Sequence, residues 1–330
     1  MKKNETPLVS FVIPAYNIGE DISACIDSIN SQNYQNIEIV VVDDGSSDDT
    51  FDVINRMAGE NPRIRPFHKE NGGAFEARLY GVSKAEGDWI MFSDADDTVT
   101  ADAVTSLIKH ASADVDLIEG RTNMNNRCLS RCEVSGHMEK QEYVRALFDA
   151  EASISPCAKL YRSTLFDSGV VRPHKKISNL EDLLMLLSLI DNARGVYVAD
   201  DAVCYNYIFR ENSMSSKSME IDKWECLFDM LQKMASGYEN SRINEALWHL
   251  KMRVAYGSIV LRGRFIEKDS NLFHQLVDTA SDYDWREVDA KLMKIVDSVE
   301  NQKRAYYFNK AKQSLRQRMK KILRALQVKK

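Results

Sequence analysis

Length and composition limit the kind of protein this chain can be. It has 330 residues, 44% of them hydrophobic and 28% charged, which is typical of a globular protein with one large domain or two domains. The longest apolar run, Leu183–Ile190, is shorter than the roughly 18 residues that a membrane-spanning helix needs. Six cysteines without a metal-site spacing, and no apolar leader after Met1, predict a cytoplasmic protein with reduced thiols.

The net charge of −5 is unevenly distributed. Residues 303–330 contain eleven Lys or Arg and no Asp or Glu, whereas the rest of the chain has 33 basic and 49 acidic residues, a net charge of −16. Between the basic residues, apolar side chains recur at helical spacing, at Leu315, Met319, Ile322, Leu323 and Leu326. A basic amphipathic helix is expected, which could lie on an anionic membrane surface or pack on a helical bundle or a second subunit. Nucleic acid is not an expected partner, because no binding motif accompanies the basic residues.

Strands and helices are predicted to alternate over the first third of the chain. Patterns of buried strands occur at residues 8–13, 37–42, 64–67 and 89–92. Helical patterns follow them at residues 20–31, 50–58, 74–85 and 101–110. Pro14 is expected to end the first strand. This order predicts an α/β fold with a mainly parallel sheet covered by helices.

After Asp97 the pattern is less regular. Strands are expected at residues 115–119, 196–198 and 203–209, helices at 140–150 and 177–192, and a mixed segment at 155–169. From Met219 onward the chain is expected to be almost continuously helical. Its apolar stripe is typical of a helical core and consists of Trp224, Leu227, Met230, Leu231 and Met234.

Three carboxylates follow the apolar segment Trp89–Phe92, at Asp94, Asp96 and Asp97. Burying such a cluster is costly unless it meets a cation or solvent, and the carboxyl edge of a parallel sheet is where ligands bind in α/β folds. Asp94 and Asp96 could hold one divalent ion, with a diphosphate as its other ligand. The alternative is a helix N-cap, with extra acidic charge near the start of the helix predicted at residues 101–110.

A dinucleotide-binding domain is the obvious rival for this alternation of elements. Its first strand should be followed by a G-x-G-x-x-G turn, but residues 14–19 read P-A-Y-N-I-G. A pyrophosphate would therefore have to be neutralised by other means, such as a cation held by acidic side chains.

Four motifs in this order and spacing resemble the inverting glycosyltransferases of family 2. They are Ser10–Asn17, Val41–Asp48, Asn71–Gly73 with Ala77, Arg78 and Gly81, and Phe92–Asp97. The resemblance is strong over residues 7–120 and weaker to about 216. It implies the A-type nucleotide-sugar fold, with a catalytic domain at residues 1–215 and a helical extension at residues 216–330. Within the catalytic domain, residues 7–120 would form the nucleotide-binding half and residues 121–215 the acceptor half.

The same resemblance implies roles for residues at the donor nucleotide. Pro14, Ala15 and Tyr16 would line the base pocket, and Asp44 would accept a hydrogen bond from the uracil N–H. Arg78 matches a basic residue that faces the sugar nucleotide, although an ordinary solvated helix charge would explain it too. For Asp43 and Asp44 the alternative is helix capping. The chain departs from the family pattern at Phe75 and Leu79, which leaves the identity of the donor open.

The resemblance also implies a metal ion and a base. Asp96 would contact Mn²⁺ or Mg²⁺, Asp94 would bind the metal, the ribose or the sugar, and Asp97 would assist. Glu181 and Asp182 match an acidic pair in which the second residue is the catalytic base, a role that inverting transfer requires. The alternative is N-terminal charge for a buried helix, capped by Asn179.

Other matching positions have weaker assignments. Arg210 and Ser213 are expected to close over the diphosphate and exclude water, unless they are incidental loop residues. Glu20 matches an acidic position of the family, and Lys159 matches a position near the acceptor or in helix packing.

Together these features predict a metal-dependent enzyme that transfers a hexose or N-acetylhexosamine from a UDP-sugar to a hydroxyl of a polysaccharide or lipid-linked glycan. It would be cytoplasmic and peripheral at the inner face of the cell membrane. A catalytically silent nucleotide-sugar-binding scaffold and a sugar nucleotidyltransferase are the alternatives.

Overall fold

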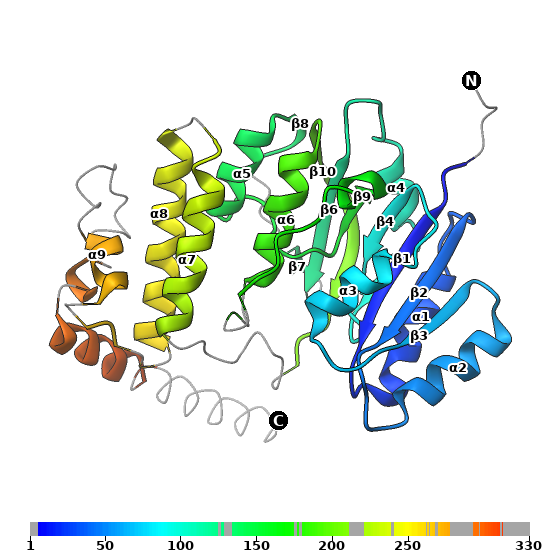
Figure 1. The fold of residues 1–330 in the computed structure, drawn as a ribbon, viewed down its shortest axis with the longest axis horizontal. Helices are drawn as coiled ribbons and strands as arrows, with labels where there is room; N and C mark the ends of the chain where they lie inside the picture. The colour runs from blue at the N-terminus through cyan, green and yellow to red at the C-terminus, as the bar shows by residue number, and fades with distance from the viewer. Residues whose placement is uncertain are drawn as a thin grey trace, which may run out of the picture. The chain divides into compact units, whose positions relative to one another are not determined.

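A computed structural model gives the fold of the chain (Figure 1). It describes residues 6–124, 127–128, 134–174, 177, 180–210, 221–238, 241–261, 263, 265–267, 270–277, 293–296, 298–310 and 312. Contacts between residues divide the chain into two compact units. Unit 1 comprises Met1–Pro173 and Leu180–Ser213, and unit 2 comprises His174–Asn179 and Met214–Lys330.

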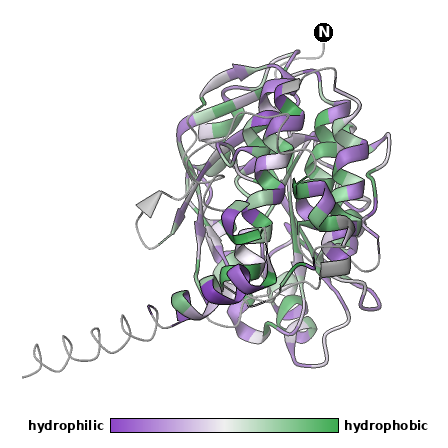
Figure 2. Cartoon of the chain, turned by 90° about the vertical axis from the view of Figure 1, so that its left-hand side faces the viewer, coloured by the Kyte–Doolittle hydropathy of each residue, from purple (hydrophilic) through white to green (hydrophobic). Residues whose placement is uncertain are grey.

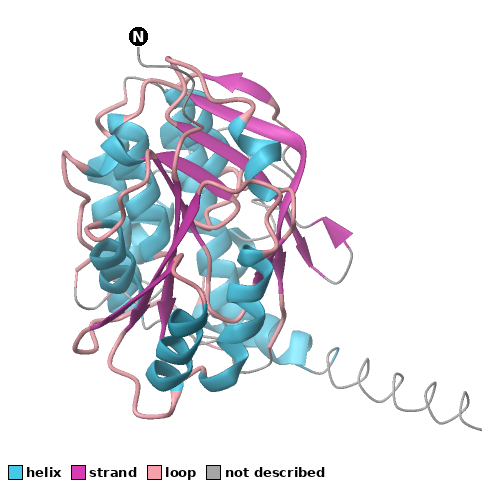
Figure 3. Ribbon diagram, turned by 90° about the vertical axis from the view of Figure 1, so that its right-hand side faces the viewer, coloured by secondary structure: helices cyan, strands magenta, loops and turns pink. Residues whose placement is uncertain are grey.

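Unit 1 is built around one sheet, in which the strands follow the order β3-β2-β1-β4-β9-β6-β10-β5. Their bounds are β1 Val9–Ala15, β2 Ile37–Asp43, β3 Ile64–His68, β4 Trp89–Phe92, β5 Thr98–Val99, β6 Leu117–Met124, β9 Lys159–Arg162 and β10 Val196–Tyr207. Two short strands extend the sheet, β7 (Arg127–Cys128) beside β6 and β8 (Gly136–Met138) beside β10. Figure 3 shows the strands as a twisted layer with helices packed around it.

The α/β fold expected from the sequence is confirmed, and its first four strands are parallel. β1 pairs in parallel with β2 and β4, and β2 pairs in parallel with β3. Further on, β9 runs antiparallel to both β4 and β6, whereas β10 runs parallel to β6. The sheet as a whole is therefore mixed. Because β9 reverses direction once on each side, β1, β2, β4 and β10 all point their carboxyl ends toward the same edge.

Helices of unit 1 form where apolar residues recur at helical spacing. Their bounds are α1 Ile22–Asn30, α2 Thr50–Glu60, α3 Ala74–Val82, α4 Ala103–Ile108, α5 Lys140–Phe148 and α6 Glu181–Asn192, with the short helices η1 Gly19–Asp21 and η2 Ser163–Phe166. In α1 the buried residues are Ile22, Cys25, Ile26 and Ile29, which lie on one face. In α6 the whole segment Leu183–Ile190 is buried, which explains its unbroken apolar run.

Pro14 does not end the first strand, contrary to the expectation. β1 continues to Ala15, and Pro14 is paired with Val42 of β2. The Val12 carbonyl accepts from Ser93 on the β4 side, so the missing N–H of Pro14, two residues on, also faces that side. Pairing with β4 already ends at Val12, so no ladder hydrogen bond is lost there.

Two other boundaries differ from the sequence pattern. The helix expected from residue 177 begins at Glu181. The strands expected at 196–198 and 203–209 are one strand, β10, whose register with β6 shifts between Val198 and Val203 and again before Tyr205. Exposed acidic residues at these irregularities, Asp200 and Asp201, interrupt the apolar pattern and made one strand look like two.

Unit 2 is helical in the part of it that the structure describes. α7 (Ile221–Ala235), α8 (Ser241–Tyr256), the short π-helical segment η4 (Gly257–Leu261) and α9 (Asn271–Val277) follow one another. Of the apolar stripe expected in α7, Trp224, Leu227 and Leu231 are buried, whereas Met230 and Met234 are half-buried. Hydrophilic and hydrophobic residues both occur along these helices, as an amphipathic pattern requires (Figure 2). None of the helices in the described residues is long and apolar enough to cross a membrane. The amphipathic pattern at residues 315–326 lies outside the described residues.

Helix α3 packs very closely on the parallel strands at Gly81. A Cβ atom at this position would lie 2.5 Å from Cγ1 of Val12 and 3.1 Å from Cγ2 of Val42. These are side chains of β1 and β2, two neighbouring parallel strands. The glycine thus sets how near α3, which carries Arg78, approaches the strands.

Replacing Gly81 by Ala should lower the free energy of unfolding by about 1–3 kcal/mol, because the added methyl group overpacks the contact with Val12. Urea unfolding measures this change. Gly59→Ala in α2 is the matched control, since no atom lies within 4 Å of its Cβ position and alanine favours helix; it should be neutral or stabilise by up to about 1 kcal/mol. Equal effects at the two positions would contradict the close approach.

Candidate functional site

Residues from four strand ends meet at one edge of the sheet in unit 1. β1 ends at Ala15, β2 at Asp43 and β4 at Phe92. β4 is followed by the acidic segment, residues 94–97, and β10 ends at Tyr207, three residues before Arg210. This is the edge at which open α/β sheets bind ligands. The first turn of α6 adds Asp182 to the same site through contacts given below.

The acidic segment after β4 is fixed by a tyrosine from β10. The hydroxyl of Tyr205 accepts a hydrogen bond from the Asp94 N–H at 3.0 Å and donates to Oδ2 of Asp97 at 2.8 Å. The Ile208 N–H donates to Oδ1 of Asp97 at 2.7 Å. α4 begins only at Ala103, and the side chain of its N-cap residue, Asp102, makes no capping hydrogen bond; the Val104 N–H in its first turn donates to Oε1 of Gln32 at 3.2 Å. The acids therefore do not serve as the cap that the alternative interpretation supposed.

The carboxylates of this segment differ in environment. Burial raises the pKa of Asp97 to about 7, and the negative charges of Asp94 and Asp96 add to this, against the hydrogen bonds from Ile208 and Tyr205. Burial and the charge of Asp94 also raise the pKa of Asp96. The Asp96 side chain is nevertheless 39% exposed and the Asp94 side chain 35% exposed. Negative charge thus accumulates where solvent, or a cation, can reach it.

Arg78 joins this segment to the acid expected to be the base. Its Nη2 donates to Oδ1 of Asp94 at 2.6 Å and its Nη1 to Oδ1 of Asp182 at 2.7 Å. Although burial opposes the charged form, Asp182 and Asp94 raise the pKa of Arg78, so the guanidinium stays charged. Asp94 and Asp182 are far apart in the sequence, and the structure places them on either side of one arginine.

Asp182 lies in the first turn of α6, a helix that begins directly after a strained residue. Leu180 has a φ of 61°, in the left-handed region that is unfavourable for a branched side chain. Burial raises the pKa of Asp182, and Asp94 adds to this, whereas Arg78 and Lys159 oppose it. Burial and the charge of Asp182 raise the pKa of Glu181. The expected cap, Asn179, lies outside the described residues.

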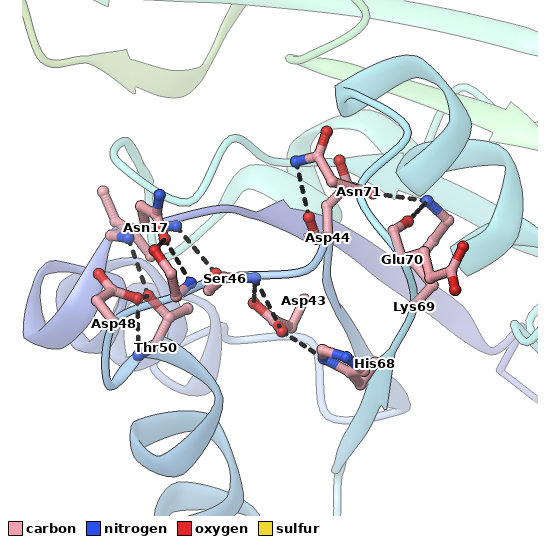
Figure 4. Close-up of polar contacts among 12 residues, drawn as sticks. Asn17, Asp43, Asp44, Ser46, Asp48, Thr50, His68, Lys69, Glu70 and Asn71 are labelled. Carbon is pink, nitrogen blue, oxygen red and sulfur yellow. Dashed lines mark hydrogen bonds and ion pairs between the residues drawn. The ribbon is translucent and has the colours of Figure 1, made fainter.

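Asp44 anchors the loop that leads into α3. Its Oδ1 accepts from Nζ of Lys69 at 2.6 Å and from the Gly72 N–H at 3.0 Å, and its Oδ2 accepts from the Gly73 N–H at 2.7 Å. Asn71 donates to the Asp44 carbonyl at 2.9 Å (Figure 4). Because a carboxylate oxygen can accept two hydrogen bonds, Oδ2 retains capacity for a ligand N–H. The ion pair with Lys69 was not predicted from the sequence.

Asp43 is fully buried and does not cap a helix. Its Oδ2 lies 2.6 Å from Nδ1 of His68, and its carboxylate accepts from the Ser46 N–H (Figure 4). The residue that bonds to the start of α2 is Asp48, whose Oδ1 accepts from the N–H and hydroxyl of Thr50. Neither Asp43 nor Asp44 caps α2, so the capping alternative for both is not supported.

The segment after β1 forms a fixed turn with an exposed ring. Pro14 is half-buried and Ala15 buried, whereas Tyr16 is 54% exposed. Asn17 has a φ of 48°, and its Oδ1 accepts from the Ser47 N–H at 2.8 Å, which ties this turn to the loop after β2. The Tyr16 ring is thus available for contact with a planar ligand.

Arg210, after β10, lies among acids from two other segments. Its Nη1 donates to Oδ2 of Asp21 at 2.9 Å, and its Nε lies 3.9 Å from Oδ2 of Asp96. Ser213, its predicted companion, lies outside the described residues. Glu20 forms an exposed ion pair with Arg56 at 2.9 Å.

Two other positions named in the sequence analysis, Lys159 and Phe75, are buried. Lys159 is completely buried, and its Nζ donates to the carbonyls of Ser153 and Ser155 at 2.8 and 2.7 Å. Phe75 is buried at the start of α3. A pocket of about 520 Å³ lies at the other end of α3, between Leu79, Glu86 and Phe166, and none of the predicted site residues lines it.

A metal ion held by Asp94 and Asp96 would need further ligands. In the described part of the chain, no group of three or more His, Cys, Asp or Glu side chains is arranged to hold a metal. Asp94 and Asp96 offer hard, partly exposed oxygens, and burial together with the charge of Asp94 raises the pKa of Asp96, an effect that a bound cation would oppose. The residues therefore fit a divalent ion that shares its coordination with a bound diphosphate.

Tyr205 was missed as a site residue by sequence reasoning, which predicted only a strand at residues 203–209. Its hydroxyl lies at the centre of the acidic segment and is fully enclosed. The position of Tyr205 in the predicted strand does not reveal this contact, because the register of β10 is irregular just before Tyr205.

Asp97→Asn should remove a pH dependence of stability. Folding raises the pKa of Asp97 to about 7 from an ordinary value of about 4, so between these pH values the folded state keeps a proton that the unfolded state has lost. Wild-type stability therefore falls as the pH rises through this range. Between pH 5 and pH 8 in metal-free buffer, urea unfolding should show the variant gaining about 1–3 kcal/mol relative to the wild type. A constant difference would contradict this.

Comparison with known proteins identifies a family domain within the chain. Residues 10–169 match the model of Glycosyl transferase family 2. Hyaluronan synthase of Pasteurella multocida is 32% identical over 222 residues, which are 67% of this chain and 22% of that protein. Glycosyltransferase GlyG of Streptococcus pneumoniae is 26% identical over 295 residues, 82% of this chain and 91% of the relative. The chain thus spans about a fifth of the length of the hyaluronan synthase.

Solved structures share the fold. The S. aureus TarS fragment 1–349 in complex with UDP-GlcNAc has a TM-score of 0.65 and 21% identity, with coverage of 94% of this chain and 92% of that one. The mannosyltransferase PcManGT of Pyrobaculum calidifontis, in complex with GDP-Man and Mn²⁺, has a TM-score of 0.55 and 16% identity over 93% and 86% of the two chains. The match over residues 10–169 places this segment of the chain in glycosyltransferase family 2.

Proposed function

We propose that this chain transfers a hexose or N-acetylhexosamine from a UDP-sugar to a hydroxyl of a polysaccharide or lipid-linked glycan, with inversion at the anomeric carbon. The observation that carries the proposal is the pair of contacts by which Arg78 joins Asp94 to Asp182, because it puts a candidate base beside the acidic segment. The names of relatives, hyaluronan synthase and chondroitin synthase, favour polysaccharide synthesis. The UDP-GlcNAc complex of TarS favours a UDP-sugar.

Asp182 would act as the general base. It accepts the proton of the acceptor hydroxyl while that oxygen forms a bond to the anomeric carbon and the bond from this carbon to the diphosphate oxygen breaks. An alcohol is a weak nucleophile, so this proton transfer is needed for attack. The raised pKa of Asp182 suits the role, because a more basic carboxylate holds the proton better.

Asp96 and Asp94 would hold Mn²⁺ or Mg²⁺ together with the donor diphosphate. When bound, such an ion would stabilise negative charge on the leaving diphosphate. The Mn²⁺ in the mannosyltransferase complex supports divalent metal use. Both carboxylates are partly exposed, as a shared ion requires.

The nucleotide and the diphosphate would be held by residues around this edge of the sheet. Pro14, Ala15 and Tyr16 would contact the base, and the spare acceptor capacity of Asp44 would receive the uracil N–H. Arg210 and Ser213 would close over the diphosphate and exclude water that would hydrolyse the donor. The catalytic domain would span residues 1–215, with residues 216–330 as a helical extension.

Asp182→Asn should lower kcat for sugar transfer by about 10²–10⁴-fold, because the amide cannot take the hydroxyl proton. Donor affinity should change little. A screen of UDP-sugars with Mn²⁺ would first identify the donor, by calorimetry and by detection of released UDP, and kcat would then be measured with it.

The exposed Asp201→Asn on β10 is the matched control and should retain wild-type kcat. Full activity of Asp182→Asn would overturn its role as base. Donor binding without any release of UDP from the wild type would indicate the silent scaffold, and release of pyrophosphate would indicate the nucleotidyltransferase.

The end of the chain would bind an anionic membrane surface, which would bring the enzyme to the inner face of the cell membrane. Residues 299–310 are helical, and Gln302 is buried and bonds to Ile266. On the exposed side of the helix are Lys303, Arg304, Tyr307, Phe308 and Lys310. Tyr307 is 62% and Phe308 74% exposed, and exposed aromatic rings among basic residues are typical of a membrane interface.

Tyr307→Ser combined with Phe308→Ser should reduce flotation of the full chain with anionic liposomes several-fold, because the rings no longer insert among the headgroups. Both positions are exposed, so the fold should be unaffected. Truncation after Asn301 is a poorer test, since it would remove the buried Gln302. Binding should weaken with salt and be lost on neutral liposomes. Unchanged flotation would leave packing on another protein surface as the role of the tail.

A further inference from the structure

We propose that Arg78 is a positioning residue for the base: its guanidinium fixes the Asp182 carboxylate and ties it to the acidic segment. This rests on the proposed function, and it differs from the role that the family resemblance implies, in which Arg78 faces the sugar nucleotide. The evidence is the two short contacts, 2.7 Å to Asp182 and 2.6 Å to Asp94.

The geometry of the contact suits positioning. Nη1 and Nη2 belong to one rigid planar group, so holding Asp94 with one and Asp182 with the other fixes the two carboxylates relative to each other. Arg78 is 4% exposed, whereas the Asp182 side chain is 31% exposed. The arginine therefore lies behind the carboxylate, and the open part of Asp182 remains free for an acceptor hydroxyl.

Arg78 is itself held in place by its helix. The start of α3 is anchored by Asp44, which accepts hydrogen bonds from the N–H groups of Gly72 and Gly73. Three residues after Arg78, Gly81 packs directly on Val12 and Val42 of the sheet. The guanidinium is thus presented from a helix fixed on both sides, as a positioning group requires.

Other charges around Asp182 cannot substitute for Arg78. Asp94 repels it, and Glu181 beside it adds a second carboxylate. Lys159 is attracted to Asp182, but its Nζ is engaged by the carbonyls of Ser153 and Ser155 and lies 3.4 Å from Oε2 of Glu119. Loss of Arg78 would therefore leave Asp182 free to move away from Asp94.

The two roles of Arg78 predict opposite kinetic results. A residue that orients the base affects the chemical step, and a displacement of about 1 Å can cost about 100-fold in rate. A residue that binds the donor in ground state and transition state alike affects affinity instead. For Arg78→Gln, positioning predicts kcat at saturating substrates about 10- to 100-fold lower, with the donor Kd changed less than about threefold.

The experiment measures donor Kd by calorimetry, and kcat with the UDP-sugar that the wild type turns over. The variants are Arg78→Gln and Arg78→Lys, each made in the wild type and in an Asp182→Asn background. Arg78→Lys keeps the charge but lacks the fork, so its kcat should also fall while donor Kd stays near the wild-type value. In the Asp182→Asn background either change should cost less than about threefold in kcat, since no base remains to be positioned. Arg65→Gln on β3, which breaks an ion pair with Glu38 of β2, is the matched control and should keep wild-type kcat.

The inference is overturned if either Arg78 variant binds donor at least tenfold more weakly while kcat at saturation is unchanged. It is also overturned if a change at Arg78 lowers kcat by the same factor in the Asp182→Asn background as in the wild type. Circular dichroism and thermal unfolding establish that the variants fold, and if Arg78→Gln does not fold, Arg78→Lys decides by the same comparison. If neither the wild type nor Arg65→Gln turns over a UDP-sugar, the proposed function is overturned, and this inference with it.

Discussion

A buried arginine held between two carboxylates is the interaction on which the site depends. An isolated charge in a protein interior costs several kcal/mol, and Arg78 avoids this by pairing with Asp94 and Asp182 at once. Each carboxylate comes from a different element, one after β4 and the other in the first turn of α6. The pairing therefore also fixes where α6 begins against the sheet, and the left-handed Leu180 just before it is the local strain that this placement requires.

The remaining acids at this edge are each stabilised in a different way. Asp44 has Lys69 and two backbone N–H groups, Asp43 has His68, and Asp97 has Tyr205 and Ile208. Asp96 lies 3.9 Å from Arg210, and its pKa is raised by burial and by Asp94. Among these carboxylates it is thus the one with most to gain from an added cation. The difference in partners thus separates the carboxylates that hold the site together, those of Asp43, Asp44 and Asp97, from that of Asp96, which is suited to bind a cation.

Sequence reasoning predicted the elements whose residues are uniformly apolar, and β4 was located at its observed bounds, Trp89–Phe92. It also predicted that acids would gather after the strands, since parallel strands end at one edge. It could not predict the partners of those acids, because the contacts of Arg78 and Tyr205 join segments more than 100 residues apart. β10 was divided in two because its register shifts interrupt the apolar pattern.

Helix α3 links the nucleotide side of the site to the base side. Its first residues follow the loop held by Asp44, its middle carries Arg78, and its last turn packs on the sheet through Gly81. A shift of the loop after β3 would therefore displace the guanidinium, and with it the carboxylate of Asp182. The spacing of Gly73, Arg78 and Gly81 follows from this: one residue ends the loop, one reaches the acids, and one permits the close approach that holds the other two in position.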